Sequence, residues 1–347
     1  MMPQEWPIAA SADEREEPAR VAGRTRLRTV RADFFLEPTE RLTEQERALM
    51  TAMLRCLVGD IASEIRAALP AGWAGANDDE AAIVNALARA GLLDDAGLIA
   101  LLLRLADEER IGTAARSRTG RGDARAIQGL VSHPDAEVSA AAMGLILARG
   151  RRRDRFGQCL LTIDDLSRET AERLIHAIAA ALRTRFRAVH GAAAADRELS
   201  NAARGLIAKH ERARSGDSLT ASLVAALHQS GALTDELLLA SAREGEVAFL
   251  AEALGRRAGI SGSVALDELL SGNALRLVTV LRLAELSRSF SAALLASFGD
   301  LIGIEDSGAA IESFDAVTAE EIQAAATWLA TPASYRAALD LLGNSNG

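Results

Sequence analysis

The side chains with the potential for chemistry in this chain are charged, and they occur in blocks. Residues 110–155 contain ten arginines and four acidic residues, a local excess of six positive charges. Two other segments are acidic: residues 76–109 contain eight acids and two arginines, and residues 300–347 contain eight acids and one arginine. An arginine-lined surface can bind a nucleic-acid backbone or an acidic protein surface.

Eight arginines of the basic block are the candidate binding residues. They come from two stretches, 112–122 and 149–155, which we expect to be loops at successive corners of a helical stack. Successive corners of such a stack lie along one edge, so the two stretches would sit side by side as an Arg-rich edge. The candidates are Arg116, Arg118, Arg121, Arg149, Arg151, Arg152, Arg153 and Arg155.

Three interpretations of the Arg-rich edge remain open. Its arginines are solvated or paired within the chain, for example with the acidic C-terminal segment; they bind an acidic protein; or they bind nucleic acid. Single-stranded nucleic acid favours aromatic side chains that stack on the bases, and only Phe156 is nearby. The sequence therefore places nucleic acid last of the three.

Recognisable catalytic and metal-binding motifs are absent from the sequence. It contains no GxGxxG, GxxxxGK[ST], GxSxG or HExxH pattern. None of the five histidines has a second histidine or a cysteine at the spacing of helical zinc ligands. His176 resembles a phosphate-accepting histidine in the middle of a helix, but an ordinary surface histidine is the simpler interpretation. We expect a protein that is not an enzyme and that needs neither metal nor cofactor.

One acidic run stands out among those at helix ends. Asp107, Glu108 and Glu109 follow an expected helix, where negative charge is mildly unfavourable because the carbonyl end of a helix is itself negative. The run is therefore a candidate contact for a basic partner or for Arg110.

The composition favours helices. Apolar residues make up 49% of the chain but aromatic residues only 3%, and alanine and leucine dominate the apolar content. This mixture suits close-packed helices better than sheets, which prefer β-branched and aromatic residues. Trp73, Trp328 and Tyr335 are scattered, and we expect them to be local anchors of the core.

Several features predict a cytoplasmic protein that does not enter a membrane. No apolar run approaches the ~20 residues of a transmembrane helix, and the first twenty residues lack the apolar stretch of a signal peptide. Cys56 and Cys159 are far apart and lack metal-binding spacing, so buried thiols in a reducing compartment are expected. The net charge of −9 is ordinary for such a protein.

Residues 130–149 contain the unit from which the rest of the chain is built. Pro134 and Asp135 suit a tight corner, because proline fixes φ and aspartate accepts hydrogen bonds at a helix start. Apolar residues then recur from Val138 at helical spacing. Similar patterns predict helices at about 43–69, 78–89, 95–109, 123–131, 135–149, 164 or 167 to 189, 197–213, 218–229, 234–243, 246–258, 264–271, 274–287, 290–302, 318–330 and 333–342. The expected caps include a Thr43–Glu46 capping box, Asp94 or Asp95, and, for the helix that ends near 189, either Asp164 or Ser167.

An internal repeat suggests two divergent copies of one helical block, at about 43–150 and 167–300. The segment Ala86-Leu87-x-x-x-Gly91-x-Leu93-x-Asp95 recurs as Ala226-Leu227-x-x-x-Gly231-x-Leu233-x-Asp235. The alternative is coincidence among Ala/Leu-rich helices. We divide the chain into a disordered tail (1–30), a first helical-repeat block (31–157), a second block (158–302) and a C-terminal helical cap (303–347).

Two resemblances accompany these patterns. The run His133-Pro134-Asp135-Ala136-Glu137-Val138 followed by Ala140-Ala141-Ala142 resembles the HEAT-repeat signature, although Ser139 replaces the arginine usual in that family. A longer stretch resembles an uncharacterised bacterial domain-of-unknown-function family of HEAT-like helical proteins. The resemblance implies that residues 33 to about 300 belong to the family's domain, and it gives no activity to transfer to this chain. The residues that carry it are Asp33-Phe34-Phe35-Leu36, Arg41-Leu42-Thr43, Glu46-Arg47-Ala48-Leu49, Leu57-Val58-x-Asp60-Ile61 and Ile65-Arg66.

The sequence thus predicts an all-α, HEAT-like α-solenoid of antiparallel helix pairs. Its expected function is that of a protein–protein interaction scaffold or regulatory adaptor, because stacked helices present long surfaces to protein partners. The partner would be acidic if the Arg-rich edge is the contact, and a homo-oligomer is compatible with this interpretation. The alternative function is nucleic-acid binding through the same edge.

Overall fold

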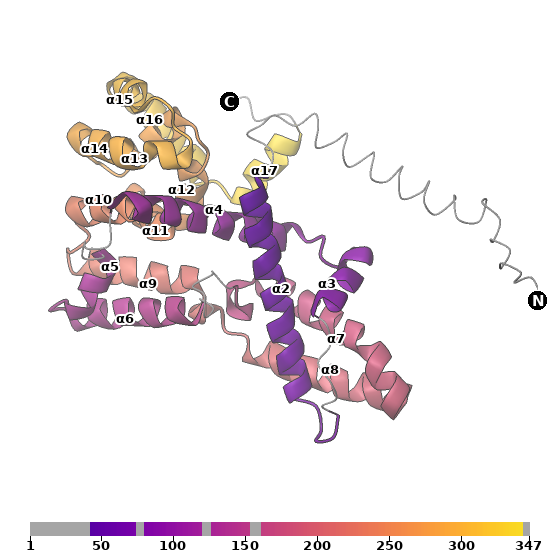
Figure 1. Cartoon of the computed structure of the whole chain (residues 1–347). Coiled ribbons are helices and arrows are strands. Elements are labelled where there is room, and N and C mark those ends of the chain that lie inside the picture. Colours follow the sequence, from indigo (N-terminus) through magenta and orange to yellow (C-terminus); the bar gives the residue numbers. More distant parts are fainter. Residues whose placement is uncertain (1–41, 74–79, 120–125, 153–160, 343–347) are drawn as a thin grey trace, which may run out of the picture. The chain divides into compact units, whose positions relative to one another are not determined.

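The computed structural model describes residues 42–73, 80–119, 126–152 and 161–342, and within these ranges it contains helices and no strands (Figure 1). The all-α prediction is therefore confirmed. The predicted tail 1–30, Cys159, and the candidate residues Arg121, Arg153 and Arg155 lie outside the described residues.

The α-helices in chain order are α2 (Glu44–Ala67), α3 (Glu80–Arg89), α4 (Ala96–Thr119), α5 (Ala126–Gly129), α6 (Ala136–Arg151), α7 (Arg168–His190), α8 (Ala192–Lys209), α9 (Gly216–Gln229), α10 (Asp235–Arg243), α11 (Val247–Ala258), α12 (Gly262–Leu269), α13 (Ala274–Leu283), α14 (Arg288–Phe298), α15 (Ser307–Ala316), α16 (Ala319–Leu329) and α17 (Ala333–Leu341). Short 3₁₀ turns η2 (Leu130–Ser132), η3 (Ile163–Asp165), η4 (Arg212–Arg214) and η5 (Gly299–Ile302) lie between them. Within the described ranges, no helix combines the length and the apolar content needed to cross a membrane.

Helix starts follow the predicted caps. Thr43 and Glu46 form the reciprocal capping box that begins α2: each side chain accepts a hydrogen bond from the other residue's amide. The Asp95 side chain accepts a bond from the Leu98 amide at the start of α4. Of the two candidates for the start of α7, Ser167 is the cap, because its hydroxyl accepts a bond from the Thr170 amide.

The corner that opens α6 is held by side chains on both sides. The Asp135 carboxylate accepts hydrogen bonds from the amides of Glu137 and Val138. The Ser139 hydroxyl, which stands where HEAT repeats usually have arginine, donates to the Val131 carbonyl at 2.6 Å. A short side chain thus ties the two arms of the corner together.

Two expectations about elements were wrong. The stretch 112–119 is helical and continues α4, because Ile111 and Ala115 extend its buried face and Gly112 allows a neighbouring corner to approach closely. The helix α15 was not predicted, because only Ala310 and Phe314 along its length are buried and the pattern of an apolar stripe is weak.

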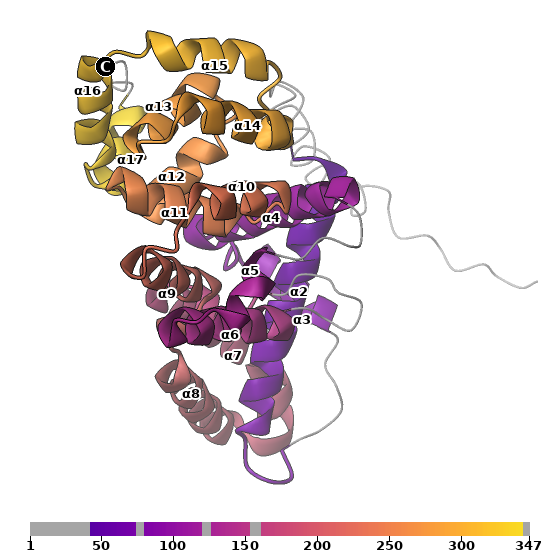
Figure 2. The same ribbon diagram turned by 90° about the vertical axis from the view of Figure 1, so that its left-hand side faces the viewer.

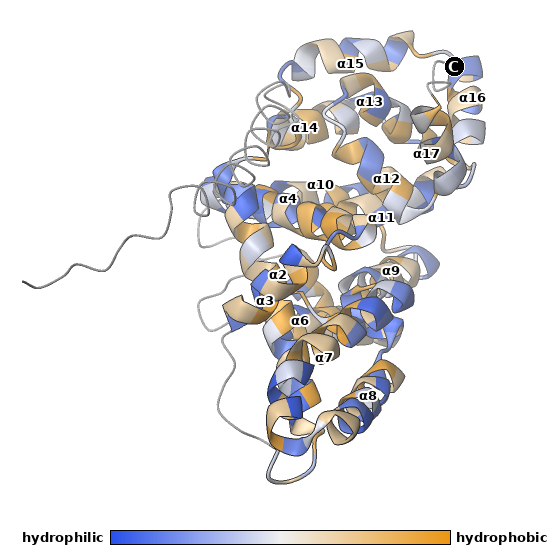
Figure 3. Cartoon of the chain, turned by 90° about the vertical axis from the view of Figure 1, so that its right-hand side faces the viewer, coloured by the Kyte–Doolittle hydropathy of each residue, from blue (hydrophilic) through white to orange (hydrophobic). Residues whose placement is uncertain are grey.

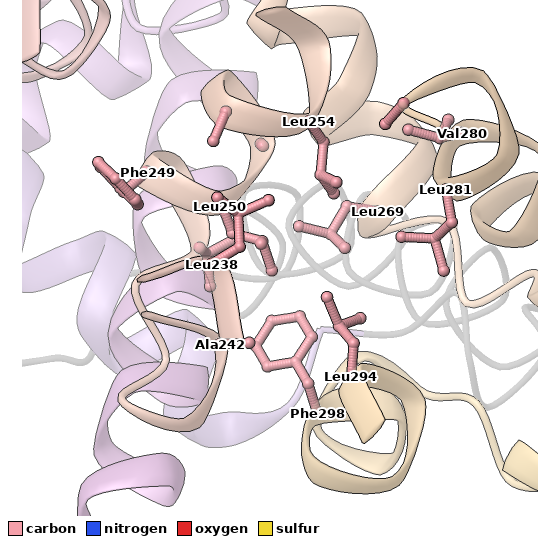
Figure 4. Close-up of a cluster of buried hydrophobic side chains, with 14 of the residues drawn as sticks. Leu238, Ala242, Phe249, Leu250, Leu254, Leu269, Val280, Leu281, Leu294 and Phe298 are labelled. Carbon is pink, nitrogen blue, oxygen red and sulfur yellow. The ribbon is translucent and has the colours of Figure 1, made fainter. Parts of the chain in front are cut away.

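The buried side chains form two hydrophobic clusters. We call them the first core and the second core. The first core joins α2, α3, the N-terminal half of α4, α7 and α8. The second core joins the C-terminal half of α4 with α5, α6 and helices from α9 to α16. Figure 4 shows its centre, where Leu250, Leu254, Leu281 and Phe298 face one another.

These cores do not follow the predicted block boundary at 157/158. Helices α7 and α8 pack on each other and, in the first core, on α2 and α3, whereas α6 packs against α9 in the second core (Figures 1 and 2). Each predicted block therefore contributes to both cores. The reason is that α4 spans the two cores: Leu98, Leu102 and Ala106 are buried in the first, and Ile111 and Ala115 in the second.

The aromatic side chains differ from one another in burial. Trp73 packs on the first core and stacks on the His190 ring, with ring centroids 3.9 Å apart. Trp328 and Tyr335 are 40% and 55% exposed, so the expectation that they anchor the core was wrong. Cys56 is half-buried rather than buried.

Candidate functional site

The described arginines of the Arg-rich edge are mostly paired with acids of the same chain. Arg116 pairs with Glu109 at 3.1 Å and Arg149 with Glu246 at 2.7 Å. Arg118 contacts both oxygens of Asp300, in the acidic C-terminal segment, at 2.9 and 2.6 Å. Arg152 contacts both oxygens of Asp165 at 2.8 and 2.9 Å. Arg151 is exposed and has no ion pair within the described ranges.

Three of these arginines meet at one cavity. Arg116 from α4 and Arg149 and Arg152 from the end of α6 line a space of about 170 Å³, which we call the Glu108 cavity. The N-terminus of α9 and the corner between α10 and α11 close its other sides. Arg118 points to a different neighbour, Asp300 in η5, and does not line this cavity.

Each arginine that lines the Glu108 cavity has its own carboxylate. Besides the three pairs already described, Arg104 lies 2.9 Å from an oxygen of Asp217. Glu108 is the remaining lining acid, and its nearest described cation is the Arg104 Nε, 3.7 Å from Oε1. That distance is too long for a hydrogen bond. Asp217 is shared, because Arg212 also contacts it at 3.1 Å. Glu108 is therefore the lining acid that has no cation at hydrogen-bond distance among the described residues.

Glu108 is chemically unusual for this reason. Its side chain is 21% exposed, but Oε1 is covered and accepts no hydrogen bond. Burial raises the pKa of the Glu108 carboxyl to about 7, opposed by the charge of Arg104 and supported by Asp217. Perturbed groups of this kind in a cavity are frequent at functional sites, although buried ion-pair networks also produce them.

Asp165 also lines the Glu108 cavity, but the pKa of its carboxyl is shifted in the opposite direction, downward. Burial alone would raise the pKa of its carboxyl, but hydrogen bonds from the Arg152 guanidinium, the Thr162 hydroxyl and the Gly216 amide hold the pKa below its ordinary value. Arg152 also donates to the Arg214 carbonyl at 2.8 Å. This network joins the ends of α6, η3, η4 and α9, so Arg152 acts as a structural link.

A second cavity, of about 470 Å³, lies between α4 and α12, and we call it the α4–α12 cavity. Its apolar lining comes from both helices: Gly97, Ala100, Leu101, Leu103, Leu266 and Leu270. Its charged lining consists of four aspartates and two arginines: Asp107, Asp165, Asp217, Asp267, Arg104 and Arg212. Arg104, Asp165 and Asp217 border both cavities, which are therefore neighbours.

Burial also affects Asp267 in this second cavity. Desolvation raises the pKa of its carboxyl, and the neighbouring charge of Glu268 raises it further. Glu268 itself accepts hydrogen bonds from two guanidinium nitrogens of Arg276, at 2.6 and 2.7 Å. Asp267 thus keeps an acidic proton more readily than an ordinary aspartate.

The sequence pointed to part of this site. The acidic run 107–109 was expected at a helix end and instead lies mid-helix, between the two cores, although the contact between Asp107 and Arg110 is confirmed at 3.2 Å. Its charged residues interrupt the apolar stripe of α4, which was the available signal. Asp217 and Glu246 come from distant segments, and only folding brings them to the cavity.

The histidines do not add a metal or phosphotransfer centre to this site. His176 lies exposed on α7, and no histidine lines either cavity. Across the described parts of the chain, no three His, Cys, Asp or Glu side chains are grouped as ligands of a metal ion.

A family model of uncharacterised proteins conserved in bacteria, DUF2336, matches residues 86–327. The chain belongs to this family. The matched range contains both cavities but begins after residues 33–66, which carried the resemblance in the sequence, and it ends beyond the expected residue 300. Comparison with curated proteins and with solved structures gave no match.

Proposed function

We propose that this DUF2336 protein is a non-enzymatic protein-binding scaffold whose binding surface is the α4–α12 cavity. The observation that carries the proposal is an apolar ridge on α4 beside a cavity of mixed polarity. Ile99 and Leu103 are 42% and 36% exposed, one helical turn apart, and Leu103 lines the cavity. Large apolar side chains grouped on a surface mark interaction sites more often than scattered ones do.

The arrangement suits an amphipathic segment of a partner. Leu101, Leu266 and Leu270 offer an apolar wall to its hydrophobic side chains. Figure 3 shows hydrophobic and hydrophilic residues mixed on α12, next to α4 and α11. An apolar groove with polar groups along its margin is the usual surface for a docked helix.

Charge favours a basic partner. Three lining aspartates are paired within the chain: Asp107 with Arg110, Asp165 with Arg152, and Asp217 with Arg104. Asp267 is exposed and has no ion pair among the described residues, so a cation of the partner can approach it without displacing an arginine. The sequence had suggested an acidic partner at the Arg-rich edge. The proposal moves the contact to another surface, because most described arginines of that edge already bind carboxylates of the same chain.

The same pairing weakens the alternative of nucleic-acid binding. A phosphate that approached Arg149 or Arg152 would have to displace Glu246 or Asp165. Among the described arginines of the edge, Arg151 is exposed and without an ion pair, and one arginine supplies little of the charge on which such binding depends.

We further propose that the helices form a HEAT-like stack. One corner geometry recurs and supports this: a left-handed residue ends a helix, and the next amide donates back to a carbonyl five residues earlier. Gly91 and Gly231 have this conformation, with bonds from Leu92 to Leu87 and from Ala232 to Leu227. Similar bonds close the corners after Gly245, Gly259, Glu285 and Gly303.

The proposed surface is tested with a defined peptide. A labelled amphipathic helix of leucine and lysine should bind the full chain in a fluorescence anisotropy titration, and added salt should weaken the binding because the attraction is screened. The same peptide with glutamate in place of lysine should bind at least tenfold more weakly.

A matched pair of variants tests whether the peptide binds at the α4 ridge. Leu103→Asp puts a charge on the α4 ridge and should weaken peptide binding at least tenfold. Leu147→Asp makes the same change on α6, where the side chain is 56% exposed and lines neither cavity. Preference for the glutamate peptide, or equal losses in the two variants, would refute the proposed surface.

A further inference from the structure

The Glu108 cavity is too small for a cofactor and the right size for the end of one side chain. Its volume is about 170 Å³. Sites for drug-sized ligands usually measure ~300–1,000 Å³. A guanidinium or an ammonium group with part of its alkyl chain fits this range.

The charges of the lining select the sign of the ligand. Arg104, Arg116, Arg149 and Arg152 each contact another carboxylate, and Arg212 also contacts Asp217 at 3.1 Å. Glu108 is the lining acid that no described cation reaches at hydrogen-bond distance. An anion would find these guanidinium groups already occupied by carboxylates. A cation would instead supply charged donors to the Glu108 carboxyl group, which has no cation at hydrogen-bond distance.

We infer that the Glu108 cavity binds an organic cation, a guanidinium or primary ammonium group, whose partner is the Glu108 carboxylate. The bound cation has two sources. One is an arginine or lysine side chain of the partner that docks in the neighbouring α4–α12 cavity, and for this source the inference deepens the proposed function and rests on it. The other source is a small free amine or guanidine. A metal ion is a poorer occupant, because no group of three suitable ligands exists among the described residues.

The surroundings of Glu108 give the binding a pH dependence. Arg104 and Arg149 favour its ionised form, whereas Asp217 and Glu246 oppose it. No histidine lines the cavity, so Glu108, with a pKa of about 7, is the lining group that changes charge near neutral pH. Its ionised fraction falls from about nine-tenths at pH 8 to about one-tenth at pH 6, so binding should weaken about tenfold between these values.

The test is isothermal titration of the full chain with methylguanidine at pH 8 and pH 6. Binding is expected at pH 8, with the tenfold loss at pH 6. Glu108→Gln removes the charge at nearly constant shape, and it should weaken binding at pH 8 at least tenfold and abolish the pH dependence. Glu137→Gln, an exposed change on α6 outside the cavity, should leave both unchanged.

Several results would overturn the inference: no binding at pH 8, equal binding by the Glu108→Gln variant, or tighter binding of inorganic phosphate than of methylguanidine. Thermal unfolding of the variant shows whether it is folded. If it is not, the pH profile of the unsubstituted protein still decides, because binding that does not change between pH 6 and pH 8 excludes Glu108 as the partner.

A second probe identifies the source of the cation. Acetyl-arginine methylamide carries the guanidinium on a capped backbone, so binding as tight as that of methylguanidine assigns the cavity to a partner's side chain. Binding of methylguanidine alone assigns it to a small free molecule. Because these probes do not need the α4 ridge, they should still bind the Leu103→Asp variant, and failure of the leucine–lysine peptide alone would refute only the proposed scaffold surface.

Discussion

At the scale of single residues, Glu108 makes the fold sensitive to pH. A carboxyl group whose pKa is about 7 in the fold and ordinarily 4.5 binds its proton more tightly in the folded than in the unfolded state. Folding is therefore penalised as pH rises from about 4.5 through 7, and the penalty is complete above 7. It amounts to about 3 kcal/mol at most, from ~1.4 kcal/mol per pKa unit.

We predict that Glu108→Gln stabilises the protein at pH 8 and has little effect at pH 5. The amide keeps the shape but needs no ionisation, so urea unfolding should give a higher free energy of unfolding at pH 8, by up to about 3 kcal/mol. An equal change at both pH values would mean that the effect comes from packing and not from the charge of Glu108.

The salt bridges Arg152–Asp165 and Arg118–Asp300 have similar two-pronged geometry but differ in exposure. The side chains of the first are 14% and 10% exposed, and those of the second 49% and 57%. We predict that Asp165→Asn lowers the free energy of unfolding by about 3 kcal/mol, because it leaves a buried guanidinium partly unpaired. Urea unfolding at pH 7 measures this.

Asp300→Asn is the matched control, and it should change stability far less because water replaces the lost partner. The loss in Asp165→Asn should shrink as pH falls below the ordinary aspartate pKa of 3.8, since protonation then removes the same charge from the unsubstituted protein. Similar losses in the two variants would contradict this account.

Sequence reasoning identified these arginines but not their partners. Arg116, Arg149 and Arg152 line one cavity, but Arg116 reaches it from within α4 and not from a loop at a corner. Their acids Glu109, Glu246 and Asp165 lie at separations that carry no fixed spacing rule, so pairing within the chain could only remain one of three interpretations.

At the scale of elements, local signals predicted most helices and their caps. The stripe Leu174, Ile178, Leu182 and Phe186 of α7 is buried throughout, and Ser167 caps the helix. The continuation of α4 through Gly112 was missed because glycine is normally a poor helix former. Glycine occurs at position 112 because a segment distant in sequence packs against it. The corner at Gly245 comes so close that a Cβ on Gly245 would lie 2.7 Å from the Gly112 Cα.

Substitutions at two corner glycines distinguish the stability cost of a strained backbone from the cost of a steric clash. Gly231 and Gly245 both have φ of +71°, but a Cβ at Gly231 would meet nothing within 4 Å. We predict that Gly231→Ala costs about 1 kcal/mol, from the left-handed conformation alone. Gly245→Ala should cost about 3 kcal/mol, since it also forces α4 away from the α10–α11 corner. Thermal unfolding of the two variants gives the comparison, and equal costs would show that the Gly112–Gly245 approach is not tight.

At the scale of the whole molecule, α4 decides how the folded chain is divided. The sequence suggested two consecutive blocks because its repeats occur in order along the chain. Packing instead groups α7 and α8 with α2 and α3, and α4 runs from one core into the other. A periodic pattern shows which face of a helix is buried but not which helix covers it, so the two cores could not be predicted.

If α4 transmits stability between the cores, breaking it should separate their unfolding. Arg110 lies on α4 between Ala106 of the first core and Ile111 of the second. We predict that Arg110→Pro, which removes a helical hydrogen bond and costs ~3 kcal/mol or more, splits one cooperative urea transition into two. Arg110→Ala removes the same side chain but keeps the helix, and it should retain a single transition.

Trp73 supplies the reporter for this experiment, because it packs on the first core. With Trp6 and Trp328 replaced by phenylalanine, its fluorescence follows that core, whereas far-UV circular dichroism follows all helices. The two curves should coincide in the Arg110→Ala variant and separate in Arg110→Pro. Coincident curves in both variants would mean that the cores are coupled through contacts other than the continuity of α4.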